Sequence, residues 1–457
     1  MQKKILAILV VVIVAVATVA AIQQTPKAAS PEARNVDIGL VAPMSTSIGQ
    51  DMHDAALMAV NEINDAGGIQ VSGWNTKVNI TLTTVDTGTD ADPTAAVTAV
   101  TQAVQSEKVD MLIGGYGSAA TLADEVVAIN NKVPFIITGA SNQLVTRRGP
   151  QGNYGGFGPT GTYSISDADG MSYMFHYCTT TFDYAKTVVD FLANEMKPMV
   201  APDRNLSLAL YYRDDSFGNA VEQAAKYWIQ NESLPINIVA DRKHPTSSSS
   251  FQTDLTVIKQ ATPDAVFVAD NPDKTPLVIT QGWNDVGLKS VYIAVENNQD
   301  PVFYNLLGAT GDGQLLESKM DPFQVPSYSS AVQTYSQKFD QTYGAMPGMM
   351  GADTYDAFYI AKNAIQNAGT LDKASVRTAI ANVDLNQMLI LTQTGKIQFS
   401  TGVNYHEIGP ETFMEQLKWN NQTNTLESQI VWPATMPGIS NFKQADFKLP
   451  TGYQAGS

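Results

Sequence analysis

VDIGLVA at residues 36–42 and DAALMAVNEINDAGG at residues 54–68 decide the fold of this chain. The first stretch is a short apolar run of strand length. The second carries its apolar residues near helical spacing and ends at Gly67 and Gly68, which suit the C-terminal cap of a helix. Another apolar run follows at residues 78–85. Strand, amphipathic helix and strand in this order predict a βαβ unit of a parallel sheet.

The same rhythm continues along the chain. Further strands are expected at residues 111–114, 135–138, 206–212, 237–240, 265–269 and 291–295, helices at 93–107 and 356–367, and a hairpin at 396–399. Residues 147–172, which hold seven Gly, interrupt the rhythm and are expected to form a long surface loop. This loop is either a plain insertion or a lid or docking surface. The pattern predicts two similar α/β lobes with parallel central sheets.

Bulk composition limits the functions that the chain can have. A chain of 457 residues exceeds what one hydrophobic core usually organises, so two domains are expected. The formal charge of −16 argues against a nucleic-acid partner, because phosphate binding needs clustered Lys and Arg. The single cysteine, Cys178, excludes an intrachain disulfide and a thiolate metal cluster.

An export element opens the sequence. Lys3 and Lys4 precede an apolar run at residues 5–22, and a polar segment with two prolines follows at residues 23–35. Both a cleaved signal peptide and a retained transmembrane anchor fit this pattern, while the lack of a following cysteine excludes a bacterial lipoprotein linkage. We expect the body of the protein outside the cytoplasm, on the cell surface or in a periplasm or pseudoperiplasm. On an exported chain, Asn-x-Ser/Thr sequons predict N-linked glycans at Asn79, Asn205, Asn231 and Asn421.

The sequence offers no catalytic or metal-binding constellation. Its four histidines are scattered, and none lies at the spacing of a zinc-binding helix. It has no Gly-x-Ser-x-Gly motif of hydrolases, and Gly395 and Lys396 are followed by Ile397 rather than by the hydroxyl residue of a Walker loop. We therefore expect no enzyme activity, no metal and no cofactor.

Two small polar turns follow predicted strands in the first half of the chain. GGYGS at residues 114–118 closes one strand and opens a helix, and TGAS at residues 138–141 follows the next strand. In an open parallel sheet, ligands bind beyond the carboxyl ends of the strands, where free amides at helix N-termini face an anion. Ser118 is therefore well placed to bind a carboxylate. A glycine-rich turn without a ligand is the alternative.

Acidic and aromatic residues follow strands in the second half. DDSFG at residues 214–218 comes after the strand at 206–212, and Glu296 directly follows the strand at 291–295. A carboxylate in this position is costly to bury and is explained by a cationic ligand group, to which the Phe217 ring would add a cation–π contact. Core packing of Phe217 and a solvated loop position for Glu296 are the alternatives.

Several of these segments together resemble the branched-chain amino-acid binding proteins of the type I periplasmic-binding class. The resemblance is carried by IGLVAPMS at 38–45, AVNEINDAGGI at 59–69, VDMLIG at 109–114 with Ser118, and VPFII at 133–137 before Ser141. Later segments that match are Phe217 with Gly218, PDAVF at 263–267, Glu296 and YDA at 355–357. The resemblance covers nearly the whole exported chain.

This resemblance implies two Rossmann-like lobes joined by three crossovers, which close as a hinge around an amino acid. The implied domains are a leader at residues 1–35, lobe 1 at 36–170 and 322–385, lobe 2 at 171–321 and 386–450, and a tail at 451–457. By position, Ser118, Gly139 and Ser141 would hold the ligand carboxylate, and Phe217 and Glu296 would meet the rest of the ligand from lobe 2. The full implied ligand set is Ser118, Ala119, Gly139, Ser141, Phe217, Asn271 and Glu296.

The sequence also departs from the family pattern. Ala55 replaces a common glycine, and Asp270 and Asn271 stand where an aromatic residue is frequent. An added acid beside the pocket favours a polar or cationic ligand, such as a basic amino acid or an amide, over leucine.

Three functions compete for such a chain. The first is an ABC importer's solute-binding protein, whose partners are a small molecule and the permease subunits in the membrane. The second is a ligand-sensing surface receptor ectodomain, which would normally carry a second transmembrane helix and an output domain, whereas this sequence ends in a polar stretch at residues 451–457. The third is a structural surface protein. The sequence favours the importer.

Overall fold

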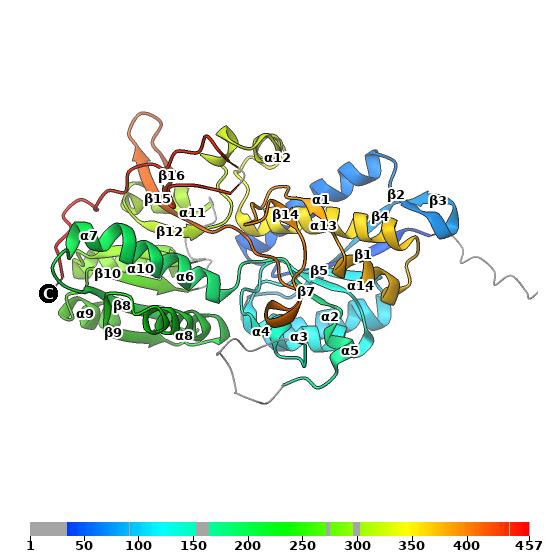
Figure 1. Cartoon of the computed structure of the whole chain (residues 1–457), viewed down its shortest axis with the longest axis horizontal. Coiled ribbons are helices and arrows are strands. Elements are labelled where there is room, and N and C mark those ends of the chain that lie inside the picture. The colour runs from blue at the N-terminus through cyan, green and yellow to red at the C-terminus, as the bar shows by residue number, and fades with distance from the viewer. Residues whose placement is uncertain are drawn as a thin grey trace, which may run out of the picture.

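The computed structural model describes residues 34–90, 92–151, 164–270, 275–295, 302–437 and 439–456. These residues form two α/β lobes that lie side by side (Figure 1). Within these ranges, no helix has both the length and the apolar character that a membrane crossing requires. The apolar run at residues 5–22, which the sequence identifies as a signal peptide or an anchor, lies outside the described residues.

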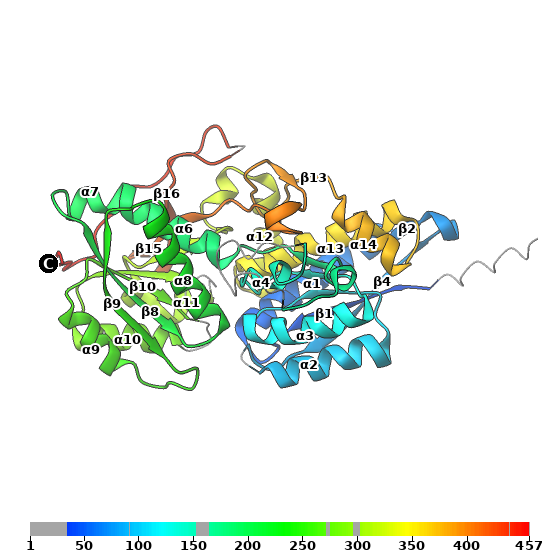
Figure 2. The same cartoon turned by 60° about the horizontal axis from the view of Figure 1, so that its bottom comes forward.

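Lobe 1 is built on a parallel sheet with the strand order β4-β1-β5-β6-β7. Its strands are β1 (Val36–Ala42), β4 (Ile80–Asp86), β5 (Met111–Gly114), β6 (Phe135–Ile137) and β7 (Met174–His176). Helices α1 (Ser47–Asp65) and α13 (Met349–Ala368) pack on one face, and α2 (Pro93–Thr101) and α3 (Ser118–Asn131) on the other (Figure 2). Because side chains alternate along a strand, Leu40 packs toward the first pair and Val41 toward the second.

Smaller elements complete this lobe and its border with the second lobe. They are the helices α4 (Leu144–Arg147), α5 (Ala168–Met171), α12 (Ser330–Tyr343) and α14 (Lys373–Ala381), the pair β2 (Ile69–Val71) and β3 (Thr76–Val78), and the pair β13 (Leu385–Asn386) and β14 (Lys396–Ile397).

Lobe 2 is built on a larger, mixed sheet with the order β16-β15-β12-β11-β10-β8-β9. Its strands are β8 (Leu206–Arg213), β9 (Ile236–His244), β10 (Ala265–Ala269), β11 (Val291–Val295), β12 (Leu315–Ser318), β15 (Phe413–Asn420) and β16 (Thr425–Trp432). Strand β15 runs antiparallel to both of its neighbours, whereas the other described pairs are parallel. Its helices are α6 (Thr181–Phe191), α7 (Lys197–Val200), α8 (Ser216–Asn231), α9 (Gln252–Gln260), α10 (Thr275–Val286) and α11 (Val302–Leu307).

The predicted two-lobed α/β fold is confirmed, with local corrections. Helix α1 begins at Ser47 rather than near residue 54, because the Thr46 hydroxyl caps it by accepting a hydrogen bond from the Gly49 amide at 3.0 Å. The first sheet includes β7, so lobe 1 continues past the boundary expected at residue 170.

The expected surface loop at residues 147–172 is wrong at both of its ends. Arg147 is 4% exposed and makes two hydrogen bonds of 2.6 Å to the buried carboxylate of Glu407. Near the other end, α5 packs against α3, and Met171 is buried. Both ends therefore belong to the packed lobe, while residues 152–163 lie outside the described residues.

Three crossovers connect the lobes within the described part of the chain. They are residues 177–180 between β7 and α6, residues 319–329 between β12 and α12, and residues 387–412, which lead from β13 to β15. We refer to the region formed by these three crossovers as the hinge, because closing of two lobes around a ligand turns on such connecting segments.

Candidate functional site

The N-termini of α3 and α8 meet where the two lobes face each other. Helix α3 starts at Ser118, directly after β5 and its turn, and α8 starts at Ser216, directly after β8. The two helices are in contact across the lobes. Helix α3 has no side-chain cap, so its N-terminus presents backbone amides and the positive end of its dipole at the border between the lobes, an arrangement suited to an anion.

The glycines of the first turn are required by close backbone packing. Gly114 and Gly115 have φ angles of 117° and 78°, which favour glycine. A Cβ atom on Gly117, the N-cap of α3, would lie 1.8 Å from the carbonyl oxygen of Asp90. The glycine-rich sequence thus brings the loop after β4 against the start of α3 and fixes the position of Ser118.

Ser118 lies against the turn that follows β6. Ser118 is 2% exposed, and its hydroxyl accepts a hydrogen bond from the Asn142 amide at 3.3 Å, while Ala119 is half-buried. Gly139 leaves no room for a side chain, because an added Cβ would lie 2.9 Å from the Gly115 carbonyl oxygen. The structure thus brings these predicted residues of lobe 1 together.

Ser141 faces the hinge. Its hydroxyl lies 3.4 Å from the Tyr184 hydroxyl, 3.7 Å from the Cys178 sulfur and 3.3 Å from the Gly139 carbonyl oxygen. It is 1% exposed. Tyr184, on α6, is a polar group at this site that the sequence interpretation missed, because nothing in its local pattern distinguishes it from a core tyrosine.

On lobe 2, Asp215 organises the start of α8. One of its carboxylate oxygens accepts hydrogen bonds from the Phe217 amide at 3.0 Å and the Gly218 amide at 2.8 Å, which makes it the N-cap. Phe217 is 1% exposed and belongs to the hydrophobic core. Core packing, the alternative considered for Phe217, is therefore what the structure shows.

Of Asp270, Asn271 and Glu296, which the sequence also singled out in lobe 2, the structure describes Asp270. Asn271 and Glu296 lie outside the described residues. Asp270, whose carboxylate suggested a cationic ligand, is fully buried, lies 3.1 Å from Nε2 of His244 and faces Nε of Arg213 at 3.8 Å. Because protein cations already compensate this carboxylate, the argument for a basic ligand loses its basis.

The hinge contains a buried ion pair that the sequence interpretation did not identify. Lys319, on the second crossover, is 0% exposed, and its ammonium pairs with Asp353 of α13 and lies 3.3 Å from the Cys178 sulfur. Burial disfavours the ammonium, but the attraction of Asp353 outweighs it, so the pKa of Lys319 is raised above its ordinary value. This ion pair thus joins the second crossover to α13 of lobe 1, next to Cys178 on the first crossover.

Asp356, one turn further along α13, holds the other two crossovers. It accepts hydrogen bonds from the Tyr177 hydroxyl at 2.9 Å and from the Leu389 and Ile390 amides at 3.1 Å. Burial raises the pKa of Asp356 to about 7 despite these bonds. All three crossovers are therefore anchored to one face of α13.

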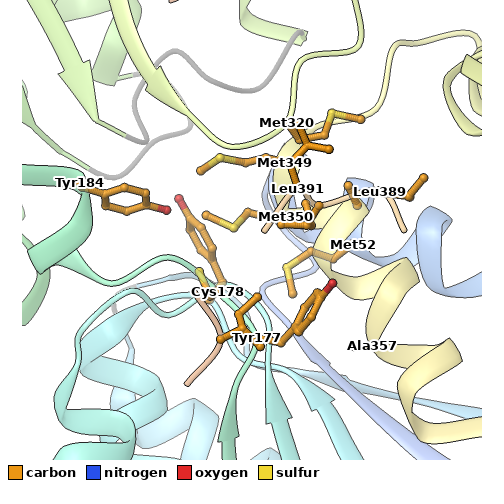
Figure 3. Packing of buried hydrophobic residues seen from close by; sticks show 14 of the residues in the cluster. Met52, Tyr177, Cys178, Tyr184, Met320, Met349, Met350, Ala357, Leu389 and Leu391 are labelled. Carbon is orange, nitrogen blue, oxygen red and sulfur yellow. The ribbon is translucent and has the colours of Figure 1, made fainter. Parts of the chain in front are cut away.

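Methionines fill the space around this anchor. Figure 3 shows Met52 of α1, Met320 of the second crossover, and Met349 and Met350 of α13 gathered beside the crossovers. Methionine side chains are long and adaptable, so this packing tolerates small rearrangements at the hinge.

The described residues contain no group of three or more metal-ligating side chains. His176 and His406 are buried and hydrogen-bonded to backbone carbonyl oxygens, at 2.8 Å for His176 Nε2 to Ala140 and 2.9 Å for His406 Nδ1 to Met174. Burial lowers the pKa of His176 to about 3 and that of His406 to about 4. These neutral imidazoles join β7 to the turn after β6 and to the third crossover.

Comparison with known proteins gives one matching family model and many similar structures. The model, described as a periplasmic binding protein, matches residues 35–414. A leucine-binding protein from Thermotoga maritima shares 17% identity over 88% of this chain and 99% of its own, with a TM-score of 0.69. The isoleucine complex of a branched-chain amino acid transporter substrate-binding protein from Streptococcus pneumoniae shares 19% identity over 88% of this chain and 100% of its own, with a TM-score of 0.68.

A third similar structure binds a different kind of molecule. It is the solute-binding protein of an ABC transporter from Rhodopseudomonas palustris in complex with 3,4-dihydroxybenzoic acid. It shares 18% identity over 91% of this chain and 99% of its own, with a TM-score of 0.69. At such identities the likeness establishes the shared fold, and one fold carries amino-acid and aromatic-acid ligands alike.

Proposed function

Because this chain belongs to the periplasmic binding protein family of ABC-transporter solute receptors, we propose that it captures an amino acid or a related small zwitterion outside the cytoplasm and delivers it to a membrane permease. The observation that carries the proposal is the meeting of the α3 and α8 N-termini between two lobes joined by a hinge. The solute would bridge these helices, and closing of the lobes would exclude water from it.

The anionic group of the solute is the better supported part of the proposal. The amides of Ser118 and Ala119 at the start of α3, which no side chain caps, and the Ser118 hydroxyl would supply donors for one carboxylate, with Ser141 beside them. Isoleucine and dihydroxybenzoic acid, the ligands of two similar proteins, both carry such a group. Glu296 and Asn271 remain proposed partners of the rest of the solute.

A thermal-shift screen of the purified protein tests the proposal. The panel of compounds contains amino acids, amides, polyamines and benzoic acids. We expect an amino acid or amide to raise the unfolding temperature more than a polyamine or a benzoic acid does. A solute at one hundred times its Kd adds about 2.7 kcal/mol to the free energy of unfolding. If only benzoic acids stabilise the protein, the proposal that its solute is a zwitterion is rejected. If no member of the panel stabilises it, the proposal that it binds a small carboxylic or amino compound is rejected.

Glycosylation belongs to the same proposal, because it requires export. All four sequon asparagines, Asn79, Asn205, Asn231 and Asn421, are exposed. Peptide mass spectrometry of protein from its natural source checks this, and unmodified asparagine at all four positions would refute it.

A further inference from the structure

An ion pair joins the two lobes at the edge of the candidate site. Nη2 of Arg213, the last residue of β8 in lobe 2, lies 2.8 Å from Oδ2 of Asp90, in the loop after β4 of lobe 1. The exposed fractions of the two side chains are 8% and 14%. We propose that this pair is a latch that stabilises the closed arrangement of the lobes and, on the premise of the proposed function, sets how long a captured solute remains bound.

Arg213 is held in place by its own lobe. Its guanidinium donates from Nε to Oδ2 of Asp215 at 2.7 Å, and the other oxygen of Asp215 caps α8. A Cβ atom on Gly218 would lie 2.1 Å from the carbonyl oxygen of Arg213, so the backbone of this residue packs tightly against α8. The lobe 2 half of the latch is therefore braced on the helix that faces the site.

Asp90 is held in the same way on the other side. Its carbonyl oxygen packs against Gly117, the N-cap of α3, and Ser118 follows directly. Each half of the latch is thus fixed to the helix N-terminus that its lobe presents to the solute. Movement of one lobe away from the other separates Asp90 from Arg213 but leaves Arg213 paired with Asp215 and Asp270.

This asymmetry makes the latch reversible. Opening exposes Asp90 to water, while Arg213 keeps two carboxylates, so neither group is left buried and uncompensated. A second contact between the lobes, from Nδ2 of Asn142 to the Ser216 carbonyl oxygen at 2.9 Å, does not involve the latch. Loss of the latch should therefore shorten the closed state without abolishing it.

Single-molecule energy transfer in the full chain, without any solute, measures the latch directly. Dyes are attached at Gln105→Cys in lobe 1 and Gln230→Cys in lobe 2, both exposed positions, while the native Cys178 is buried. We expect Asp90→Asn to shorten the closed dwell time about tenfold, the factor that 1.4 kcal/mol of lost interaction gives. Salt at 0.5 M should shorten the wild-type dwell time much less than this substitution does, because partly buried ion pairs are only weakly screened.

Asp214→Asn is the matched control, because Asp214 neighbours the latch but pairs with Lys243 of its own lobe at 3.0 Å. Asp90→Glu should restore part of the dwell time. Equal closed dwell times in wild type and Asp90→Asn, or a wild-type protein that stays open, would overturn the latch. Since no solute is used, this failure would leave the proposed receptor function standing.

Discussion

Replacing Lys319 by Met is expected to lower the free energy of unfolding by about 3–5 kcal/mol, because it leaves the Asp353 carboxylate in the hinge without its cation. Lys319 is 0% exposed, and so is Asp353. Methionine matches the length of the lysine stem, so the loss comes from the uncompensated charge rather than from a cavity. Urea unfolding of the wild type and the variant measures the loss. The dependence of the free energy of unfolding on urea concentration is compared between the two proteins to check that their unfolded states are alike.

A second variant separates the charge from the packing. Lys319→Met combined with Asp353→Leu removes both charges, and we expect it to recover at least half of the lost stability, since a buried ion pair contributes little over an apolar pair of similar volume. Equal stability of the single and the double variant would contradict the view that Lys319 serves as the counterion of Asp353.

Replacing Gly117 by Ala is expected to weaken solute binding about 100-fold. The added Cβ would lie 1.8 Å from the Asp90 carbonyl oxygen, a backbone atom that moves only with its loop, so the start of α3 must shift. Such a shift misplaces the Ser118 donors, and each lost hydrogen bond to a charged group is worth about 1.5–3 kcal/mol. Calorimetric titration with the strongest solute from the thermal-shift screen measures the change.

Gly409→Ala is the control for this substitution. It lies on the third crossover, and the nearest atom to its added Cβ is a side-chain oxygen of Gln393 at 3.7 Å, an ordinary contact. We expect its affinity to equal that of wild type. Unchanged affinity in Gly117→Ala would show that the solute does not depend on the start of α3.

Buried parallel strands were the most predictable part of this fold. The runs that form β1, β5, β10 and β11 were predicted with the observed ends, because strands covered on both faces are continuously apolar and end at turn residues. Strand β15 was missed, since Glu415, Gln416 and Lys418 interrupt its apolar pattern. Strand β7 was missed because it is only three residues long and follows the glycine-rich segment.

The lobe 1 side of the candidate site was predictable, because it follows the general rule that ligands bind at the carboxyl ends of parallel strands. Ser118, Gly139 and Ser141 follow strands of a parallel sheet, and the carboxyl ends of such strands share one edge. Lys319 and Asp353 could not be found in this way, since isolated charged residues in a sequence predict exposed positions and their pairing depends on the packed hinge. The interpretation of Asp270 was wrong for the same reason, because its partners Arg213 and His244 lie at the ends of two other strands, β8 and β9, and only the folded sheet brings them together.

Native mass spectrometry of protein isolated from its natural source, without a denaturing step, tests the central claim most directly. We expect a population of the protein that carries one small carboxylic acid with an amino group. Unfolding and refolding should remove this molecule, and the Gly117→Ala variant should not retain it. A natural isolate without any bound molecule, together with a refolded protein that takes up no amino acid or amide from a saturating mixture, would contradict a solute receptor of this kind.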